Sequence, residues 1–328
     1  IELTYKGQSF LKVLLYQGSF DKQEDLEENA KAAANVVDLE LFKSANTFRV
    51  RVGSYSMKME LEQETGAQII SKLEKTPKVS LGSPELPVYV FFSEKGFVGI
   101  DFSGKDLGKR EYKVYHAPTS IRGTIGYGLL KLAGYDCSGT IVDPFCDSGT
   151  VLIEAALYAT KRSVNFYNKT DFAFADSSMC KEIDWQKKLE NFDKEMKETE
   201  AKIQGFDERM PVIHATKKNA KIAGVEKIIQ VSKQSVDWLD TKLDKKSVKF
   251  IVSKIREFNK FTEQDVIKIY DDLFYQANYV LSDDGVLLLA MMKDDRVLEA
   301  ARKHGFKEEK LDNIFSGQQP LIVYKFKK

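Results

Sequence analysis

The stretch Asp143-Pro144-Phe145-Cys146-Asp147-Ser148-Gly149-Thr150 decides the fold of this chain. A short apolar run, 140–142, precedes it, and an apolar helical pattern, 151–156, follows it. A strand, a polar turn and a helix in this order predict a cradle for a small molecule, because free backbone N–H groups and the positive helix end face whatever sits there. In a doubly wound sheet, ligands bind in this crevice at the carboxyl ends of the strands.

Strands and helices alternate along the whole second part of the chain. Such alternation predicts a parallel α/β sheet, that is, a Rossmann-like domain over 119–328. Helices are expected at 119–133, where Gly134 ends the pattern, at 215–222, 262–277 and 297–301. The expected strands after the first are 203–206, 228–232, 248–252, 286–290 and 322–326.

The first hundred residues follow a different pattern. Residues 47–52 alternate, with apolar side chains on one face and arginines on the other. A hairpin is expected over 88–101, and helices are expected from Asp21 and around 69–73. This mixture predicts an α+β region divided into 1–45 and 46–102. A basic, polar linker over 103–118 follows, and an aromatic and then charged insertion spans 161–201.

Composition excludes several classes of protein. The chain has 328 residues with 50 basic and 49 acidic side chains, so binding to nucleic acid would need a local basic patch. Three cysteines without CxxC spacing and three histidines give neither a disulfide framework nor a metal site. No apolar run is long enough to cross a membrane, and we expect a cytoplasmic protein. The chain starts at Ile1 without Met, which we interpret as a fragment.

A second carboxylate belongs with the loop. Asp207 follows Gly205 at the end of the strand 203–206, where an acid accepts hydrogen bonds from ribose hydroxyls in dinucleotide folds. The alternative is that both sites are ordinary turns from strand to helix, with Asp as an N-cap. That alternative does not predict the Asp-Pro-Phe-Cys order of the loop.

Basic residues form a candidate nucleic-acid surface. Clustered cations attract phosphates in a way that does not depend on base sequence. A solvated charged face explains the same residues when they are taken alone. The candidates are Arg49 and Arg51, which share one strand face, and Lys105, Lys109, Arg110 and Lys113 of the linker.

The sequence of the loop, together with Ile153-Glu154-Ala155-Ala156 after it, resembles the S-adenosylmethionine loop of the THUMP-domain RNA methyltransferases that modify the N2 amine of guanine. Residues 47–51 resemble the opening strand of a THUMP domain, and 101–115 its exit and linker. Residues 116–118 are similar to the segment that leads into the catalytic domain. The part before Thr47 resembles the second half of the family's ferredoxin-like N-terminal domain.

The resemblance implies a class I methyltransferase domain preceded by a ferredoxin-like and THUMP region. It implies methyl transfer from S-adenosylmethionine to guanine N2 in tRNA or rRNA, with RNA as the partner and no membrane or metal. The cofactor-binding residues that it implies are Asp143, Phe145, Cys146, Asp147, Ser148, Gly149, Thr150, Asp207 and Ser235.

The sequence departs from the family where the target base is held. After strand 250–252 the family has Asn/Asp-Pro-Pro-Tyr/Phe, whereas this chain has Ser253 and then Lys254-Ile255-Arg256-Glu257. A lysine ammonium cannot accept the protons of the target amine. Asp147 also stands where the family usually has Gly, which brings a carboxylate close to that of the methionine moiety.

Two hypotheses therefore stay open. One is an active enzyme with an unorthodox acceptor motif. The other is a catalytically degenerate member, a pseudoenzyme that binds RNA beside an active protein partner. A DNA amino-methyltransferase would share the acceptor chemistry but would leave the THUMP-like part unexplained.

Overall fold

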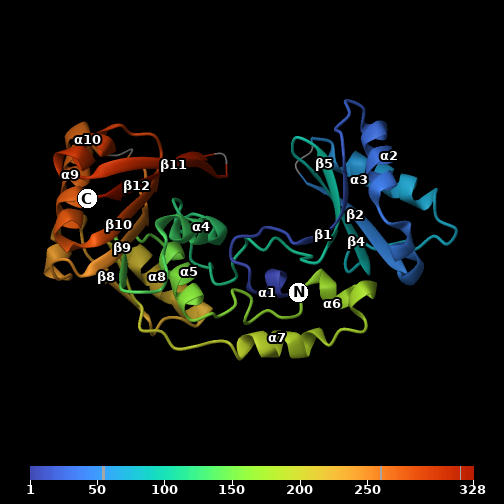
Figure 1. Cartoon of the computed structure of the whole chain (residues 1–328), viewed down its shortest axis with the longest axis horizontal. Coiled ribbons are helices and arrows are strands. Elements are labelled where there is room, and N and C mark those ends of the chain that lie inside the picture. Colours follow the sequence, from blue (N-terminus) through green and yellow to red (C-terminus); the bar gives the residue numbers. More distant parts are fainter. Residues whose placement is uncertain (54–55, 259–260, 318) are drawn as a thin grey trace. The chain divides into compact units, whose positions relative to one another are not determined.

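The computed structural model describes residues 1–53, 56–258, 261–317 and 319–328, which form two compact units (Figure 1). One unit comprises Ile1–Leu107 and Asn165–Lys194, and the other comprises Gly108–Val164 and Glu195–Lys328. The segment Asn165–Lys194 thus packs with the first unit although its neighbours in sequence belong to the second. The finer division of the first hundred residues stays a prediction.

The second unit contains the expected α/β sheet. The strands run in the order β11-β12-β10-β9-β6-β7-β8. The five strands from β10 to β8 pair in parallel, while β12 and β11 are antiparallel additions at one edge. The bounds are β6 Thr140–Asp143, β7 Lys202–Asp207, β8 Ile229–Lys233, β9 Val248–Lys254, β10 Leu281–Met291, β11 Lys307–Ser316 and β12 Gln319–Lys327.

Helices cover both faces of this sheet, as Figure 1 shows. Parallel strands buried on both faces read as nearly continuous apolar runs, which is why the sequence revealed them. One core cluster lies under α4 Gly123–Ala133, α5 Thr150–Ala159 and α8 Met210–Ala223. The other lies under η3 Val236–Thr241, α9 Glu263–Val280 and α10 Arg296–Lys303.

The first unit is a five-stranded sheet in the order β1-β5-β4-β2-β3. Phe48, Val50 and Val52 are buried with residues of α2 and α3, as their alternation predicted. The strands are β1 Leu14–Phe20, β2 Thr47–Gly53, β3 Lys78–Val79, β4 Leu86–Phe92 and β5 Gly96–Asp101. The helices are α1 Glu2–Lys6, α2 Leu26–Val36, η1 Leu39–Ser44, α3 Lys58–Ile70, α6 Ala173–Asp176, η2 Ser178–Cys180 and α7 Trp185–Asp193.

Two predicted helix starts are wrong. The helix expected from Asp21 begins at Leu26, because Asp25 caps it by accepting from the Glu28 N–H at 3.0 Å. The helix expected from residue 119 begins at Gly123, although it ends before Gly134 as predicted. Strand β11 was not predicted, because its sequence is mostly charged or polar and its few apolar residues, Leu311, Ile314 and Phe315, do not alternate. Within the described ranges, no helix combines the length and the apolar character that a membrane span requires.

Candidate functional site

The predicted cradle forms where β6 passes into α5. Asp147 and Gly149 take φ angles of 49° and 85°, which turn the chain back so that α5 begins at Thr150. A Cβ on Gly149 would lie 2.5 Å from Cγ2 of Thr216, so only glycine fits there. No side chain of the described structure caps α5, which leaves its first N–H groups directed at the crevice.

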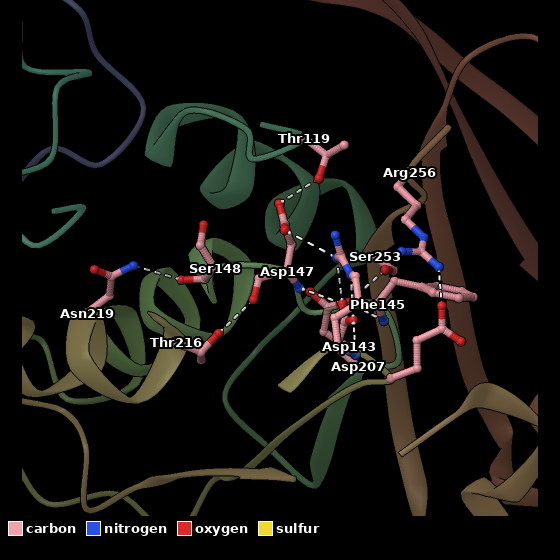
Figure 2. A network of polar contacts seen from close by, with 12 residues as sticks. Thr119, Asp143, Phe145, Asp147, Ser148, Asp207, Thr216, Asn219, Ser253 and Arg256 are labelled. Atoms are coloured by element: carbon pink, nitrogen blue, oxygen red, sulfur yellow. Dashed lines mark hydrogen bonds and ion pairs between the residues drawn. The ribbon is translucent and has the colours of Figure 1, made fainter. Parts of the chain in front are cut away.

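Helix α8 holds the loop in place (Figure 2). The Thr216 hydroxyl donates to the Asp147 carbonyl at 2.8 Å, and Asn219 Nδ2 donates to the Ser148 carbonyl at 3.1 Å. The Cys146 N–H donates to the Phe206 carbonyl at 2.9 Å, which ties the loop to β7. These bonds fix the loop backbone before any ligand arrives.

Asp143 is a buried acid at the start of the loop. Its Oδ1 accepts hydrogen bonds from the Ser253 hydroxyl at 2.6 Å and from the Phe145 N–H at 3.1 Å. Burial nevertheless raises the pKa of Asp143 to about 7, because the charged form loses its hydration. This carboxyl group therefore titrates close to neutral pH.

Asp207 contacts the loop, but its carboxylate is already bound by a guanidinium. Its Oδ2 accepts from the Asp147 N–H at 3.3 Å, which places it beside the cradle. Arg209 donates two hydrogen bonds to the same carboxylate, from Nε to Oδ1 and from Nη2 to Oδ2, both at 2.9 Å. A ribose that binds Asp207 must compete with this guanidinium. Arg209 was not among the residues predicted from the sequence. Only its position two residues after the end of β7 places it near the site.

The carboxylate of Asp147 is neutralised from two sides. Arg209 Nη2 lies 3.4 Å from its Oδ1, and the Thr119 hydroxyl donates to its Oδ2 at 3.1 Å. Thr119, which precedes α4, therefore helps to hold the loop. Asp147 tolerates its left-handed φ, which aspartate adopts more readily than most residues.

A small pocket of about 20 Å³ lies between the loop and the end of β9. It brings together Asp147 of the loop and Lys254 of β9. Ser148 and Gly149 shape the loop behind it, and Ser235 precedes η3, outside the pocket lining. The lining residues are Thr119, Ser120, Ile121, Asp143, Phe145, Cys146, Asp147, Thr150, Val151 and Lys254.

The acceptor segment continues β9 beyond Lys254. The buried Ile255 donates its N–H to the Ala290 carbonyl at 2.9 Å, so the pairing with β10 continues one residue beyond Lys254. Arg256 pairs with Glu208 and lies 5.5 Å above the ring of Phe258. A second pocket of about 220 Å³ is lined by Ile255, Arg256, Glu257, Phe258, Val266, Tyr270, Met291, Met292, Lys293, Asp294 and Arg296.

Three of the predicted RNA-binding residues, Arg49, Arg51 and Lys105, line one cavity of about 650 Å³ in the first unit. Lys12, Lys58 and Tyr89 line it too, and so do residues 170–173 and Asp176 of the insertion. The cavity also holds acids: Glu62, Asp101, Asp106, Asp171 and Asp176. It is a hollow of mixed charge that contains cations, lined by residues of β2, β4, α3 and the insertion.

The other three predicted basic residues belong to the second unit. Lys109 is exposed. Arg110 is not on the surface: its Nε lies 2.7 Å from Oε1 of Glu154, and both side chains are buried. Lys113 donates to the Ile121 carbonyl, and burial lowers its pKa to about 8. Arg110 is therefore a core residue, which the sequence could not show because its partner lies on α5.

The described residues contain no group of three or more His, Cys, Asp or Glu side chains arranged to hold a metal ion. The site is thus built from a loop, a helix end, two buried acids, one guanidinium and one buried lysine.

Comparison with known proteins assigns this arrangement to a family. The family model "RMKL-like, methyltransferase domain" matches residues 110–320. The chain belongs to this methyltransferase family. The matched residues span nearly all of the second unit, including the loop, Asp207 and Lys254.

Similar curated proteins are RNA methyltransferases. The tRNA (guanine(6)-N2)-methyltransferase of Methanocaldococcus jannaschii is 27% identical over 317 residues, which cover 91% of this chain and 81% of that protein. The ribosomal RNA large subunit methyltransferase K/L of Aliivibrio fischeri is 27% identical over 245 residues, 72% of this chain but only 34% of that protein. The chain thus spans about a third of the K/L enzyme.

Solved structures share the fold. SMU.472, crystallised with SAH, superimposes with a TM-score of 0.77 at 19% identity over 98% of this chain and 86% of that one. TrmN from Thermus thermophilus gives a TM-score of 0.66 at 18% identity, over 95% and 82%. The predicted α/β methyltransferase fold is confirmed, and the family agrees with S-adenosylmethionine as the cofactor.

Proposed function

We propose that the protein binds S-adenosylmethionine in the β6–α5 crevice and methylates guanine N2 in a tRNA or rRNA. The observation that carries the cofactor assignment is the fixed loop, with Asp207 hydrogen-bonded to the Asp147 N–H at 3.3 Å. The open N–H groups of α5 suit the methionine end, and Asp207 suits the ribose hydroxyls. When bound, the cofactor supplies an electrophilic methyl group.

The chain's own contribution is positioning. The 220 Å³ pocket beyond Lys254 has room for a flipped base, and Phe258 at its wall offers an aromatic face for stacking. Phe145 of the loop packs edge-on against Phe258 with ring centroids 6.5 Å apart, so the two pockets share a wall. Orientation of this kind accounts for much of the rate gain in such reactions.

RNA would be held by the first unit, which we assign to the THUMP-like part of the chain. Arg49, Arg51 and Lys105 would neutralise phosphates from within the 650 Å³ cavity. Arg110 takes no part, because it is buried against Glu154.

Lys254 favours a second candidate function. Its ammonium stands where the family has an amine acceptor, so a non-catalytic RNA-binding subunit stays a candidate. The two candidates share the fold and the RNA surface and differ only in the methyl-transfer step.

Calorimetric titration with S-adenosylhomocysteine separates these functions when followed by an assay. The protein is incubated with methyl-labelled S-adenosylmethionine and total tRNA or rRNA, and the nucleosides are identified by mass spectrometry. Micromolar binding with N2-methylguanosine supports the enzyme. RNA binding without cofactor binding at millimolar concentration supports the non-catalytic subunit and contradicts the first proposal.

A further inference from the structure

Lys254 is a buried lysine that forms no close ion pair among the described residues, although the charges of Asp147 and Glu257 act on it from a longer distance. It ends β9, is 9% exposed, and lines the 20 Å³ pocket beside the first turn of α5. With the part of the chain that the structure describes, it makes no hydrogen bond and no ion pair within 4 Å. Burying a charge without a partner costs several kcal/mol, so this position calls for an anion.

The acids in the pocket are already engaged. Asp147 is held by Arg209 and by the Thr119 hydroxyl, and Asp143 accepts from Ser253 and the Phe145 N–H. Burial lowers the pKa of Lys254, and the charges of Asp147 and Glu257 only partly oppose this effect, while the charge of Arg209 adds to it. An anion within hydrogen-bond distance of Lys254 would therefore come from a ligand.

The pocket's size and position restrict that ligand. A volume of about 20 Å³ admits a group little larger than one water molecule, which fits the end of a carboxylate but not a ring. Thr150 and Val151 of the first turn of α5 line it, and a helix N-terminus favours negative charge. Lysine and helix end thus converge on one anionic position.

We propose that Lys254 binds the carboxylate of the methionine moiety of S-adenosylmethionine and so selects ligands that carry it. This inference rests on the proposed function. It gives Lys254 a role in cofactor selection in place of amine binding. A nucleotide phosphate has the same chemistry, but the loop, α5 and the nearby Asp207 favour the cofactor as its source.

The test compares two ligands that differ only in this carboxylate. Calorimetry on the full chain would measure the dissociation constants of S-adenosylmethionine and decarboxylated S-adenosylmethionine. We expect the first to bind at least about tenfold more tightly, the ratio that one charge-assisted hydrogen bond supplies. In Lys254→Met the ratio falls to about threefold or less, the preference that the N-terminus of α5 supplies without the lysine. Lys249→Met is the matched control on the same strand, where Lys249 pairs with Asp136 at 2.9 Å, and it keeps the preference.

Each other outcome overturns the inference. Equal affinities in the unchanged protein overturn it alone and leave the proposed function intact, whereas binding of neither ligand overturns both. Equal affinities together with inorganic phosphate binding that Lys254→Met abolishes assign the anion to RNA. If Lys254→Met does not fold, the ratio in the unchanged protein and in Lys254→Gln decides.

Discussion

Single residues set the shape of the β6–α5 loop. Gly149 has a φ of 85° and lies against Thr216. We expect Gly149→Ala to lower the free energy of unfolding by about 1–3 kcal/mol, through strain and the clash with Thr216. Urea unfolding measures this loss. Gly128→Ala in α4, where an added Cβ meets nothing within 4 Å, is the control and should be neutral or stabilising. Equal stability of the two variants would contradict the account.

Asp143 makes stability depend on pH. Its pKa is about 7 in the folded protein against an ordinary value of 3.8, so the folded state binds the proton more tightly. The free energy of unfolding therefore falls as pH rises from about 4 to 7, at up to about 1.4 kcal/mol per pH unit, and levels off above that range. Asp143→Asn should remove this fall in denaturation curves at each pH. The exposed Asp244→Asn should retain it, and an unchanged slope in Asp143→Asn would refute the assignment.

Arg209 competes for the proposed ribose site. Its guanidinium occupies both oxygens of Asp207 at 2.9 Å. We expect Arg209→Ala to tighten S-adenosylhomocysteine binding by roughly three- to tenfold, since the ribose hydroxyls no longer displace it. Calorimetry would show this, with the exposed Arg302→Ala as a control. Weaker binding would mean that Arg209 helps to hold the ligand.

At the scale of elements, α5 is anchored by a buried ion pair. Glu154 accepts from Arg110 Nε at 2.7 Å and from the Tyr112 hydroxyl at 2.8 Å. Removing one partner leaves the other as a buried charge without an ion pair. We therefore expect Arg110→Met to lower the free energy of unfolding by about 3–5 kcal/mol. Arg110→Met with Glu154→Leu should cost less than Arg110→Met alone. Thermal or urea unfolding tests both, and a larger loss in the double variant would contradict the pairing.

The elements that could be predicted were those with a clear apolar period. In the parallel strand 248–252 and in the alternating strand 47–52, the pattern of apolar residues itself indicates which side chains are buried. Strand β11 lies at an edge of the sheet and could not be predicted, because most of its residues are charged or polar and its few apolar residues do not alternate. The loop could be predicted from the order of its residues. The Arg209–Asp207 and Arg110–Glu154 ion pairs could not, because the sequence does not show which side chains lie next to each other in the fold.

At the scale of the molecule, RNA affinity is assigned to the first unit. Arg51 is exposed on β2 at the 650 Å³ cavity. We expect Arg51→Ala to weaken tRNA or rRNA binding several-fold and to reduce the slope of log affinity against log salt by about one. Filter binding at several salt concentrations measures both. Lys95→Ala, in the β4–β5 turn of the same unit and outside the cavity lining, is the control. Equal effects would place the RNA elsewhere.

The course of the chain through Asn165–Lys194 has a consequence for synthesis. The polypeptide passes from one unit to the other at 107/108, 164/165 and 194/195. Phe172, Phe174 and Leu189 of this segment complete a core with Tyr5 and Leu107. A growing chain folds from its N-terminus as it leaves the ribosome. This core therefore stays incomplete until residue 194 has emerged, by which time β6 and α5 have already been made. A break at residue 107 would release a piece that can never cover Tyr5.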